Sequence, residues 1–184
     1  VFHTFWMGMP TQVNHQKFHP GFNVSVMWDF RVSPNSPISF GLGLGTSYYT
    51  QFSNAMLQYD SKSDVMRYSL LPVSVADTCL NRHIPLEFRY RHSNGFKFSL
   101  GVRLGLVAEV SHRYKGPNLS GSGADQNFKS FEVFNKQKYN VDFFMRCGWK
   151  FVSVYYSYQV NKLFESGKGP QINPMSLGIS FSIF

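Results

Sequence analysis

One segment of the chain, Phe96–Val110, alternates strictly between two kinds of residue. Every even-numbered position from Phe96 to Val110 is apolar. The odd positions are small or charged, apart from one valine: Lys97, Ser99, Gly101, Arg103, Gly105, Val107 and Glu109. A period of two predicts a β-strand with two unlike faces. Because strands usually have about five or six residues, a strand of this length restricts the folds that the chain can adopt.

The same alternation returns along the rest of the chain, so we predict eight strands. The other seven are Phe2–Met9, Phe22–Val32, Ile38–Tyr48, Ile84–Arg91, Tyr139–Trp149, Val152–Val160 and Met175–Ile183.

The predicted strands are joined alternately by long and short connections. The short ones are Ser33–Pro37, Ser93–Gly95 and Gly148–Phe151, and the long ones are Pro10–Pro20, Thr50–Cys79, Ser111–Asn135 and Asn161–Pro174. If successive strands are antiparallel, all four long loops meet at one end and the short turns at the other. This arrangement is typical of up-and-down barrels with short periplasmic turns and long extracellular loops. We therefore expect residues 1–184 to form one eight-stranded antiparallel up-and-down β-barrel domain.

The composition favours a transmembrane, porin-like barrel over a soluble one. Charged residues make up only 15% of the chain, against about 25% in soluble domains. No stretch of the sequence is typical of a transmembrane helix. In a soluble lipocalin-like barrel the apolar face would point inward around a small ligand, and this remains an alternative. Glycine and serine on the polar face leave room on a concave wall, so we expect that face to line the interior.

This orientation assigns each face of the strands. The residues expected to face lipid are Phe22, Val24, Val26, Trp28, Phe40, Leu42, Leu44, Leu86, Phe88, Phe98, Leu100, Val102, Leu104, Leu106, Val141, Phe143, Met145, Val154, Tyr156, Leu177, Ile179 and Phe181, with Val110 on the same face. The expected luminal charge network is Asp29, Arg31, Glu87, Arg89, Arg91, Lys97, Arg103, Glu109, Lys138, Asp142 and Arg146. Buried charges persist only when they are paired and hydrogen-bonded. At eight strands the interior is just wide enough for side chains to fill it, so we expect no open pore.

Two segments resemble a known family. His83–Tyr90 (HIPLEFRY) and Asn94–Gly105 (NGFKFSLGVRLG) are similar to the IPLLLKY…NGF…L…G core of the Bacteroidota outer-membrane β-barrel domain family. Gly21-Phe22 and Ser176–Phe181 also look like that family. The resemblance implies a location in the outer membrane of a Gram-negative bacterium. Some members are barrel subunits of envelope machines such as type IX secretion, and the resemblance carries over no catalytic residue.

An enzymatic alternative rests on Arg91–Gly95 (RHSNG). Lipid A deacylases are also eight-stranded outer-membrane barrels, and they carry a His-x-Ser-Asn motif with a Glu on the next strand, a role that Glu109 could take. Here His92 and Ser93 are adjacent, so they would face opposite sides of a strand. Asn94-Gly95 is also a favoured hairpin turn. We therefore predict no catalytic residues and no enzyme.

The sequence suggests no cofactor and no metal. His15 and His19 share one loop but have no carboxylate or cysteine neighbour, and this makes a weak metal site. Cys79 and Cys147 fall at opposite ends of the predicted barrel, so we expect two free thiols. The net charge is +8, and the basic residues occur singly along the strands rather than in runs. No nucleic-acid-binding motif is present.

We therefore expect a non-enzymatic outer-membrane protein with a structural or accessory role. The expected partners are outer-membrane lipid and lipopolysaccharide, together with other outer-membrane or periplasmic protein subunits that would bind the long loops. Loops beyond about 12–15 residues are usually functional or disordered. Phe184 departs from the alternation of the last strand, because it is out of phase with the apolar positions of that strand.

Overall fold

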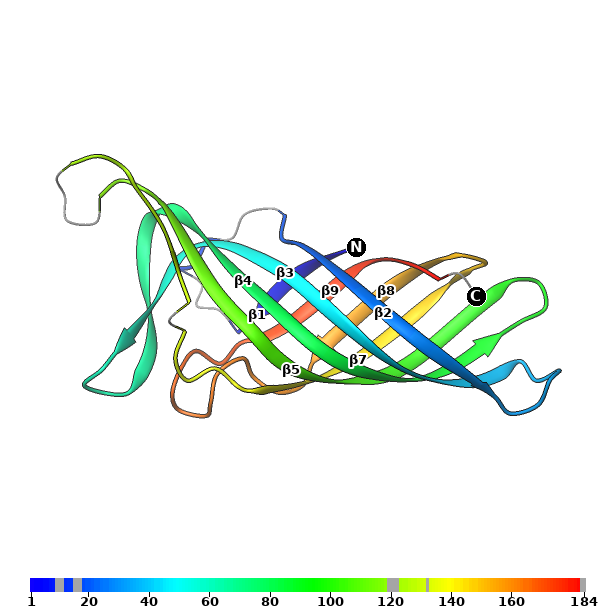
Figure 1. The fold of residues 1–184 in the computed structure, drawn as a ribbon. Helices are drawn as coiled ribbons and strands as arrows, with labels where there is room; N and C mark the ends of the chain where they lie inside the picture. The colour runs from blue at the N-terminus through cyan, green and yellow to red at the C-terminus, as the bar shows by residue number, and fades with distance from the viewer. Residues whose placement is uncertain (9–11, 15–17, 119–122, 132, 183–184) are drawn as a thin grey trace.

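Eight antiparallel strands close into a ring in the computed structural model (Figure 1). The structure describes residues 1–8, 12–14, 18–118, 123–131 and 133–182. The strands are β1 (Phe2–Met7), β2 (Pro20–Arg31), β3 (Ile38–Asp60), β4 (Val65–Arg91), β5 (Phe96–Gly116), β6 (Gln126–Ser130), β7 (Tyr139–Trp149), β8 (Val152–Gln159) and β9 (Asn173–Phe181). Around the ring the order is β4-β3-β2-β1-β9-β8-β7-β5, and β5 pairs with β4 to complete it. The described residues contain no helix, so no described segment could cross a membrane as a helix.

All eight predicted strands are present, and their connections lie as the alternation requires. The turns after β2, β4 and β7 lie together at one end, which we call the turn end (Figure 1). The long connections lie at the other end, which we call the capped end. Met9, Ile183, Phe184 and parts of two long connections lie outside the described residues.

Two predicted loops are wrong. Most of Thr50–Cys79 continues β3 and β4 as a hairpin, whose register runs from Thr50↔Thr78 out to Asp60↔Val65. Within Ser111–Asn135, β5 continues to Gly116 and pairs with β6, which was not predicted. These segments extend beyond the ring, where the sequence need not separate an apolar from a polar face. Without that alternation they look like loops.

A β-bulge corrects two further assignments. Leu80 pairs with Glu109 but Asn81 pairs with Val107, so Ala108 is an extra residue in β5. One extra residue exchanges the two faces of a strand. Val110 therefore points inward and is buried in the core, whereas Glu109 lies on the outside, half-exposed, 3.7 Å from the ammonium of Lys129 on β6. Glu109 does not belong to the interior network.

The apolar core fills the capped end of the ring. Its members come from the strands and from the long connections and include Trp6, Leu57, Met66, Cys79, Val110, Val133, Leu163, Phe164 and Ile172. Backbone hydrogen bonds tie the connections together: Met66 N–H donates to Lys168 O at 2.9 Å, and Gln137 N–H donates to Leu163 O at 2.9 Å. The long connections are thus packed over the ring.

Asp64, in the turn between β3 and β4, joins three of these connections. Its carboxylate accepts hydrogen bonds from the Tyr59 hydroxyl (2.8 Å) and from Asn135 Nδ2 (3.2 Å), and it lies 3.0 Å from Lys168 Nζ. The hydrogen bond from Tyr59, followed by the contacts of Lys168 and Asn135, lowers the pKa of Asp64 to about 2. The cap is therefore held by polar contacts at its surface as well as by its apolar core.

Candidate functional site

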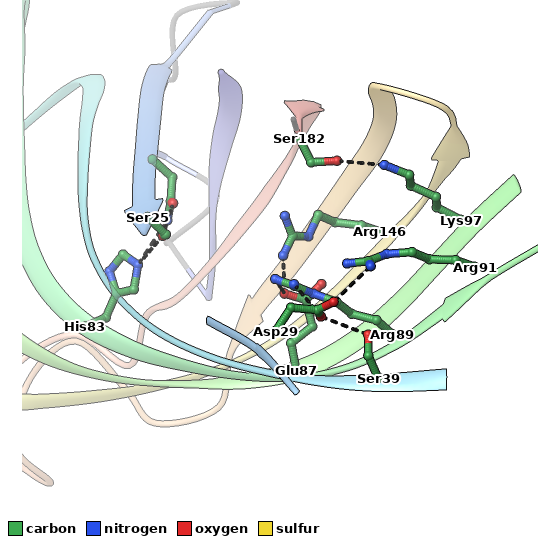
Figure 2. A network of polar contacts seen from close by, with 11 residues as sticks. Ser25, Asp29, Ser39, His83, Glu87, Arg89, Arg91, Lys97, Arg146 and Ser182 are labelled. Atoms are coloured by element: carbon green, nitrogen blue, oxygen red, sulfur yellow. Dashed lines mark hydrogen bonds and ion pairs between the residues drawn. The ribbon is translucent and has the colours of Figure 1, made fainter. Parts of the chain in front are cut away.

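The interior of the ring toward the turn end holds a network of charged side chains (Figure 2). They come from β2, β4, β5 and β7, which are far apart in the sequence. Each lies at an inward position of its strand and alternates with apolar residues that point outward. The ring brings opposite charges from different strands into contact.

Asp29 on β2 is one centre of this network. Its carboxylate accepts hydrogen bonds from Ser39 Oγ (2.8 Å), Arg89 Nη1 (3.0 Å) and Arg91 Nη1 (2.9 Å). Arg31 Nε lies 3.9 Å away, but its side chain is 58% exposed. Hydrogen bonds to an ionised carboxylate are the stronger ones, so Asp29 joins β2 to both β3 and β4.

Glu87 on β4 is the second centre of this network, with 1% of its side chain exposed. Arg89 Nη2 donates to it at 3.2 Å, and Arg146 on β7 also donates to it. Arg89 thus bridges Asp29 and Glu87. Charge pairing runs from β2 through β4 to β7, across the ring interior.

A separate pair lies nearer the capped end. Arg103 Nε is 3.5 Å from Asp142 Oδ2, and Arg103 also donates to the hydroxyl of Tyr155. Its guanidinium lies over the rings of Phe144 (5.4 Å to the centroid) and Tyr155 (5.7 Å). Cation–π contacts of this kind are stronger in desolvated sites. Asn140 Nδ2 completes the cluster by donating to Asp142 at 3.3 Å.

Glycine on the inward face makes room for these long side chains. A Cβ at Gly41 would lie 2.9 Å from the guanidinium carbon of Arg89, and one at Gly105 would lie 2.0 Å from Asn140 Oδ1. A Cβ at Gly101 would lie 2.6 Å from the ring of Phe144. Alternate positions of β3 and β5 therefore have to be small for the polar cluster to fit.

The remaining predicted luminal residues lie at the margins. Lys97 is half-buried and reaches Ser182 Oγ at 3.5 Å (Figure 2). Lys138 immediately precedes β7 and is exposed. Counting Arg31 and Lys97, six cationic side chains face three carboxylates, Asp29, Glu87 and Asp142, among the described interior residues. The interior therefore carries an excess of positive charge.

Apart from Val110, the residues predicted to face lipid point away from the ring interior. Most are exposed large hydrophobic side chains, from Phe88 at 38% to Phe181 at 71%. Four of them are partly buried: Phe98, Val102, Val141 and Tyr156. The molecule thus presents apolar side chains on its convex surface and charge on its concave one.

A cavity of about 590 Å³ remains beside the charged residues. Its lining includes Met27, His83, Arg103, Arg146 and Tyr155 from the interior. His83 Nε2 lies 3.3 Å from Ser25 Oγ (Figure 2). Side chains fill the capped end of the ring, as expected, but they do not fill this part of the interior.

Residues of the enzymatic alternative form an ordinary turn. His92 and Ser93 follow β4, where His92 N–H donates to Phe96 O at 2.8 Å and Gly95 N–H donates to His92 O at 3.0 Å. The His92 ring accepts a hydrogen bond from Asn94 N–H at 3.3 Å. Glu109 lies at the far end of β5 from this turn. The geometry brings no acid, base and nucleophile together here.

The histidines and cysteines among the described residues form no metal centre. His19 Nδ1 accepts a hydrogen bond from Phe52 N–H (3.0 Å), and His15 lies outside the described residues. No group of three or more metal-ligating side chains occurs in the described part of the chain. Cys79 is buried, Cys147 is exposed and both are free thiols, as predicted.

Sequence reasoning missed several polar members of the interior, above all His83, Asn140 and Tyr155. All three lie at inward positions of their strands. Their signal was the same alternation: His83 is in phase with Glu87 and Arg89, and Asn140 with Asp142. A search for charge alone passes over uncharged residues that complete the cluster.

Asp77 is a buried carboxyl group near the capped end that was also missed. It is 3% exposed, and its ladder partner on β5 is His112, itself buried. Burial raises the pKa of Asp77 to about 8. The carboxyl group is therefore neutral in the folded protein at pH 7, whereas it ionises near pH 4 in an unfolded chain.

We predict that Glu87→Gln destabilises the fold by about 3–5 kcal/mol, because it leaves Arg89 and Arg146 without their shared anion. The matched control is Glu109→Gln, whose half-exposed side chain should change the free energy of unfolding by about 0.5 kcal/mol or less. Urea unfolding of detergent-solubilised protein, followed by tryptophan fluorescence, measures both. Equal effects of the two substitutions would contradict the role of Glu87.

The contribution of Asp77 to the free energy of unfolding should decrease as the pH rises. Its folded pKa lies above its unfolded pKa, so its contribution is full below about pH 4 and declines as the pH rises toward 8. The stability of Asp77→Asn relative to the wild type should therefore increase between pH 5 and 8, by at most about 1.4 kcal/mol per pH unit. Denaturant titrations at several pH values measure this difference. Because His112 is present in both proteins, its own titration cancels in the difference. A flat difference for Asp77→Asn would contradict the assignment.

Comparisons with models of protein families, with curated proteins and with solved structures find no match to this chain. Its function therefore has to be inferred from its residues and their geometry.

Proposed function

We propose that the protein is an integral outer-membrane β-barrel of a Gram-negative bacterium, with a structural or accessory role in a membrane protein complex and no enzymatic activity. The observation that carries this proposal is the orientation of the ring. Apolar side chains cover its outer face, and paired charges occupy its interior. In a soluble ligand-binding barrel the two faces would be exchanged.

The outer apolar band is long enough to cross a bilayer on β5, and it is shorter on β4. On β4 it runs from Ile84 to Tyr90 and is limited by Arg82, an exposed outward-facing residue. On β5 it runs from Phe96 to Leu106 and is limited by Glu109. A tilted strand crosses the hydrocarbon layer in about 9–11 residues. Asp77, the β3–β4 turn and β6 would then lie outside the bilayer, on the extracellular side.

A water-exposed surface of this kind would be unusual for a soluble protein. Large contiguous apolar patches mark interaction sites or membrane contacts, and here the apolar surface surrounds the ring. In lipid, every backbone N–H and C=O group has to be paired within the protein. The ring supports the proposal because its strands pair with one another over most of their length.

An accessory role is supported by the capped end. The β3–β4 hairpin, the segment after β6 and the connection after β8 pack together, and Asp64, Asn135 and Lys168 join them. A packed surface is a better protein contact than separate flexible loops, because less conformational freedom is lost on binding. Basic residues at this end, including Lys115 and Lys129, are suited to lipopolysaccharide phosphates. The segments that resemble Bacteroidota outer-membrane barrels, His83–Tyr90 and Asn94–Gly105, suggest the same role.

The proposal predicts how a single charge placed on the outer face affects folding into lipid. Leu86→Arg lies midway between Arg82 and Tyr90, so it should weaken folding into phosphatidylcholine vesicles by about 2–4 kcal/mol. Phe131→Arg, outside the apolar band, should have little effect. Flotation of refolded protein with vesicles on a density gradient measures insertion.

Wild-type protein that folds without detergent and stays in the aqueous fraction would contradict the membrane location. Equal flotation of the Leu86→Arg and Phe131→Arg variants would contradict the position of the band. The accessory role has its own test, purification from membranes in a mild detergent with mass spectrometry of associated subunits. Incubation of the purified protein with lipopolysaccharide should release no fatty acid.

A further inference from the structure

The outer face of the β5–β6 hairpin, which extends beyond the ring at the capped end (Figure 1), carries three exposed cations. Beyond the bulge in β5, Tyr114 is buried, so its neighbours Arg113 and Lys115 point outward. On β6, Lys129 is the ladder partner of Arg113, and Asn127 is the ladder partner of Lys115. Arg113, Lys115 and Lys129 therefore lie on one surface.

Arg113 and Lys129 are directly opposite each other although both are positively charged. Like charges at opposite positions of two strands repel each other and destabilise the pairing. The hairpin relieves this repulsion only in part. Lys129 Nζ lies 3.7 Å from a carboxylate oxygen of Glu109, but both side chains are about half-exposed. Among the described residues, the only polar contact of the Arg113 side chain is the hydrogen bond from Nε to Asn127 Oδ1, at 3.2 Å.

These contacts leave hydrogen-bond donors that no described residue uses. Because Arg113 donates to Asn127 through Nε, both of its Nη groups are available, as is Nδ2 of Asn127. The ammonium of Lys115 contacts no acceptor in the described part of the chain. A guanidinium presents its N–H groups in a fork that fits two oxygens of a phosphate. The surface therefore combines unrelieved positive charge with the donors that an oxyanion needs.

Carboxylates of the protein do not complete this cluster. Elsewhere at the capped end, carboxylates pair with cations, as Asp64 does with Lys168 at 3.0 Å. Between residues 107 and 131 the chain has two carboxylates, Glu109 and Asp125. Neither forms an ion pair with Arg113. The anion that would balance the opposed cations is therefore not supplied by this hairpin.

The cluster begins at the height of a lipid headgroup. On β5 the apolar band ends at Leu106, and Glu109 follows two ladder steps later, because Ala108 is an extra residue. At about 3.3 Å per step and a tilt of about 45°, the ammonium of Lys129 beside Glu109 lies about 5 Å above the hydrocarbon layer, and the headgroup layer is about 5–7 Å deep. The same ammonium lies 4.4 Å from the centre of the Phe131 ring, which is exposed. Exposed aromatic residues at this height are typical of membrane barrels.

We propose that this surface binds a phosphate group of an outer-leaflet lipid, with Arg113 and Lys129 as the main ligands and Lys115 beside them. The inference rests on the proposed function, because it takes the apolar band to be in the membrane. A bound phosphate removes the repulsion between the opposed cations and accepts hydrogen bonds from their unused donors. A lipid is favoured over free phosphate because Phe131 joins the cluster to the apolar band, so that the headgroup and its acyl chains are bound together.

The test measures the binding of lipid A to the purified protein in neutral detergent micelles by isothermal titration calorimetry. Wild-type protein should bind phosphorylated lipid A about tenfold or more tightly than dephosphorylated lipid A. Arg113→Gln and Lys129→Gln should each weaken binding by about fivefold, as expected for one cation beside an anionic lipid. The matched control is Lys62→Gln, which removes the same charge from the exposed β3–β4 turn and should leave the affinity unchanged.

Thermal unfolding in the same micelles without lipid A separates binding from a structural role. Because Arg113→Gln removes one of two opposed cations, it should leave the unfolding midpoint unchanged or raise it. A lower midpoint for this variant would mean that Arg113 stabilises the hairpin by itself, and this would overturn its role as a lipid ligand.

Four other results would overturn the proposal. Equal weakening by Lys62→Gln would mean that net charge alone attracts the lipid. Equal binding of dephosphorylated lipid A would assign the contact to the acyl chains or sugars. Displacement of lipid A by excess inorganic phosphate would make this a site for the free ion. Wild-type protein that floats with vesicles but binds no lipid A in micelles would overturn this inference alone, and the proposed membrane location would stand.

Discussion

Charge that is enclosed by a ring of strands has to be paired, and this requirement determines the inner half of the molecule. Asp29 and Glu87 each bind two arginines, and Arg89 binds both carboxylates. These contacts join β2, β4 and β7 across the interior. The glycines of β3 and β5 follow from the same requirement, since a Cβ at Gly41 would meet the Arg89 guanidinium. The small residues thus leave the space that the paired charged side chains occupy.

The two ends of the ring are stabilised differently. At the capped end the long connections bring Phe164, Leu163 and Val133 into an apolar core with Trp6. At the turn end, polar contacts hold the strands, and a cavity remains where β1 stops pairing with β2. This division agrees with a protein whose packed end meets partners outside the bilayer.

The sequence predicted the strands of the ring well, because each must present an apolar face and a polar face. The same signal failed where the chain leaves the ring, so the outer parts of β3 and β4 looked like a loop and β6 was missed. Glu109 and Val110 were assigned to the wrong faces because nothing in the sequence marks Ala108 as a bulge. The sequence also did not show which of the luminal cations pair with Asp29. Arg89 is sixty positions away, and only the register of β2, β3 and β4 brings the two together.

The central claim is the orientation of the two faces, and the tryptophans test it most directly. Trp28 points outward within the apolar band of β2, whereas Trp6 is buried inside the capped end. Single-tryptophan variants are made with phenylalanine at the other two positions and refolded into vesicles whose lipids carry bromine on the acyl chains. The account predicts strong quenching of Trp28 fluorescence by the brominated lipids and little quenching of Trp6. Quenching of Trp28 by aqueous iodide, with none by the brominated lipids, would contradict it.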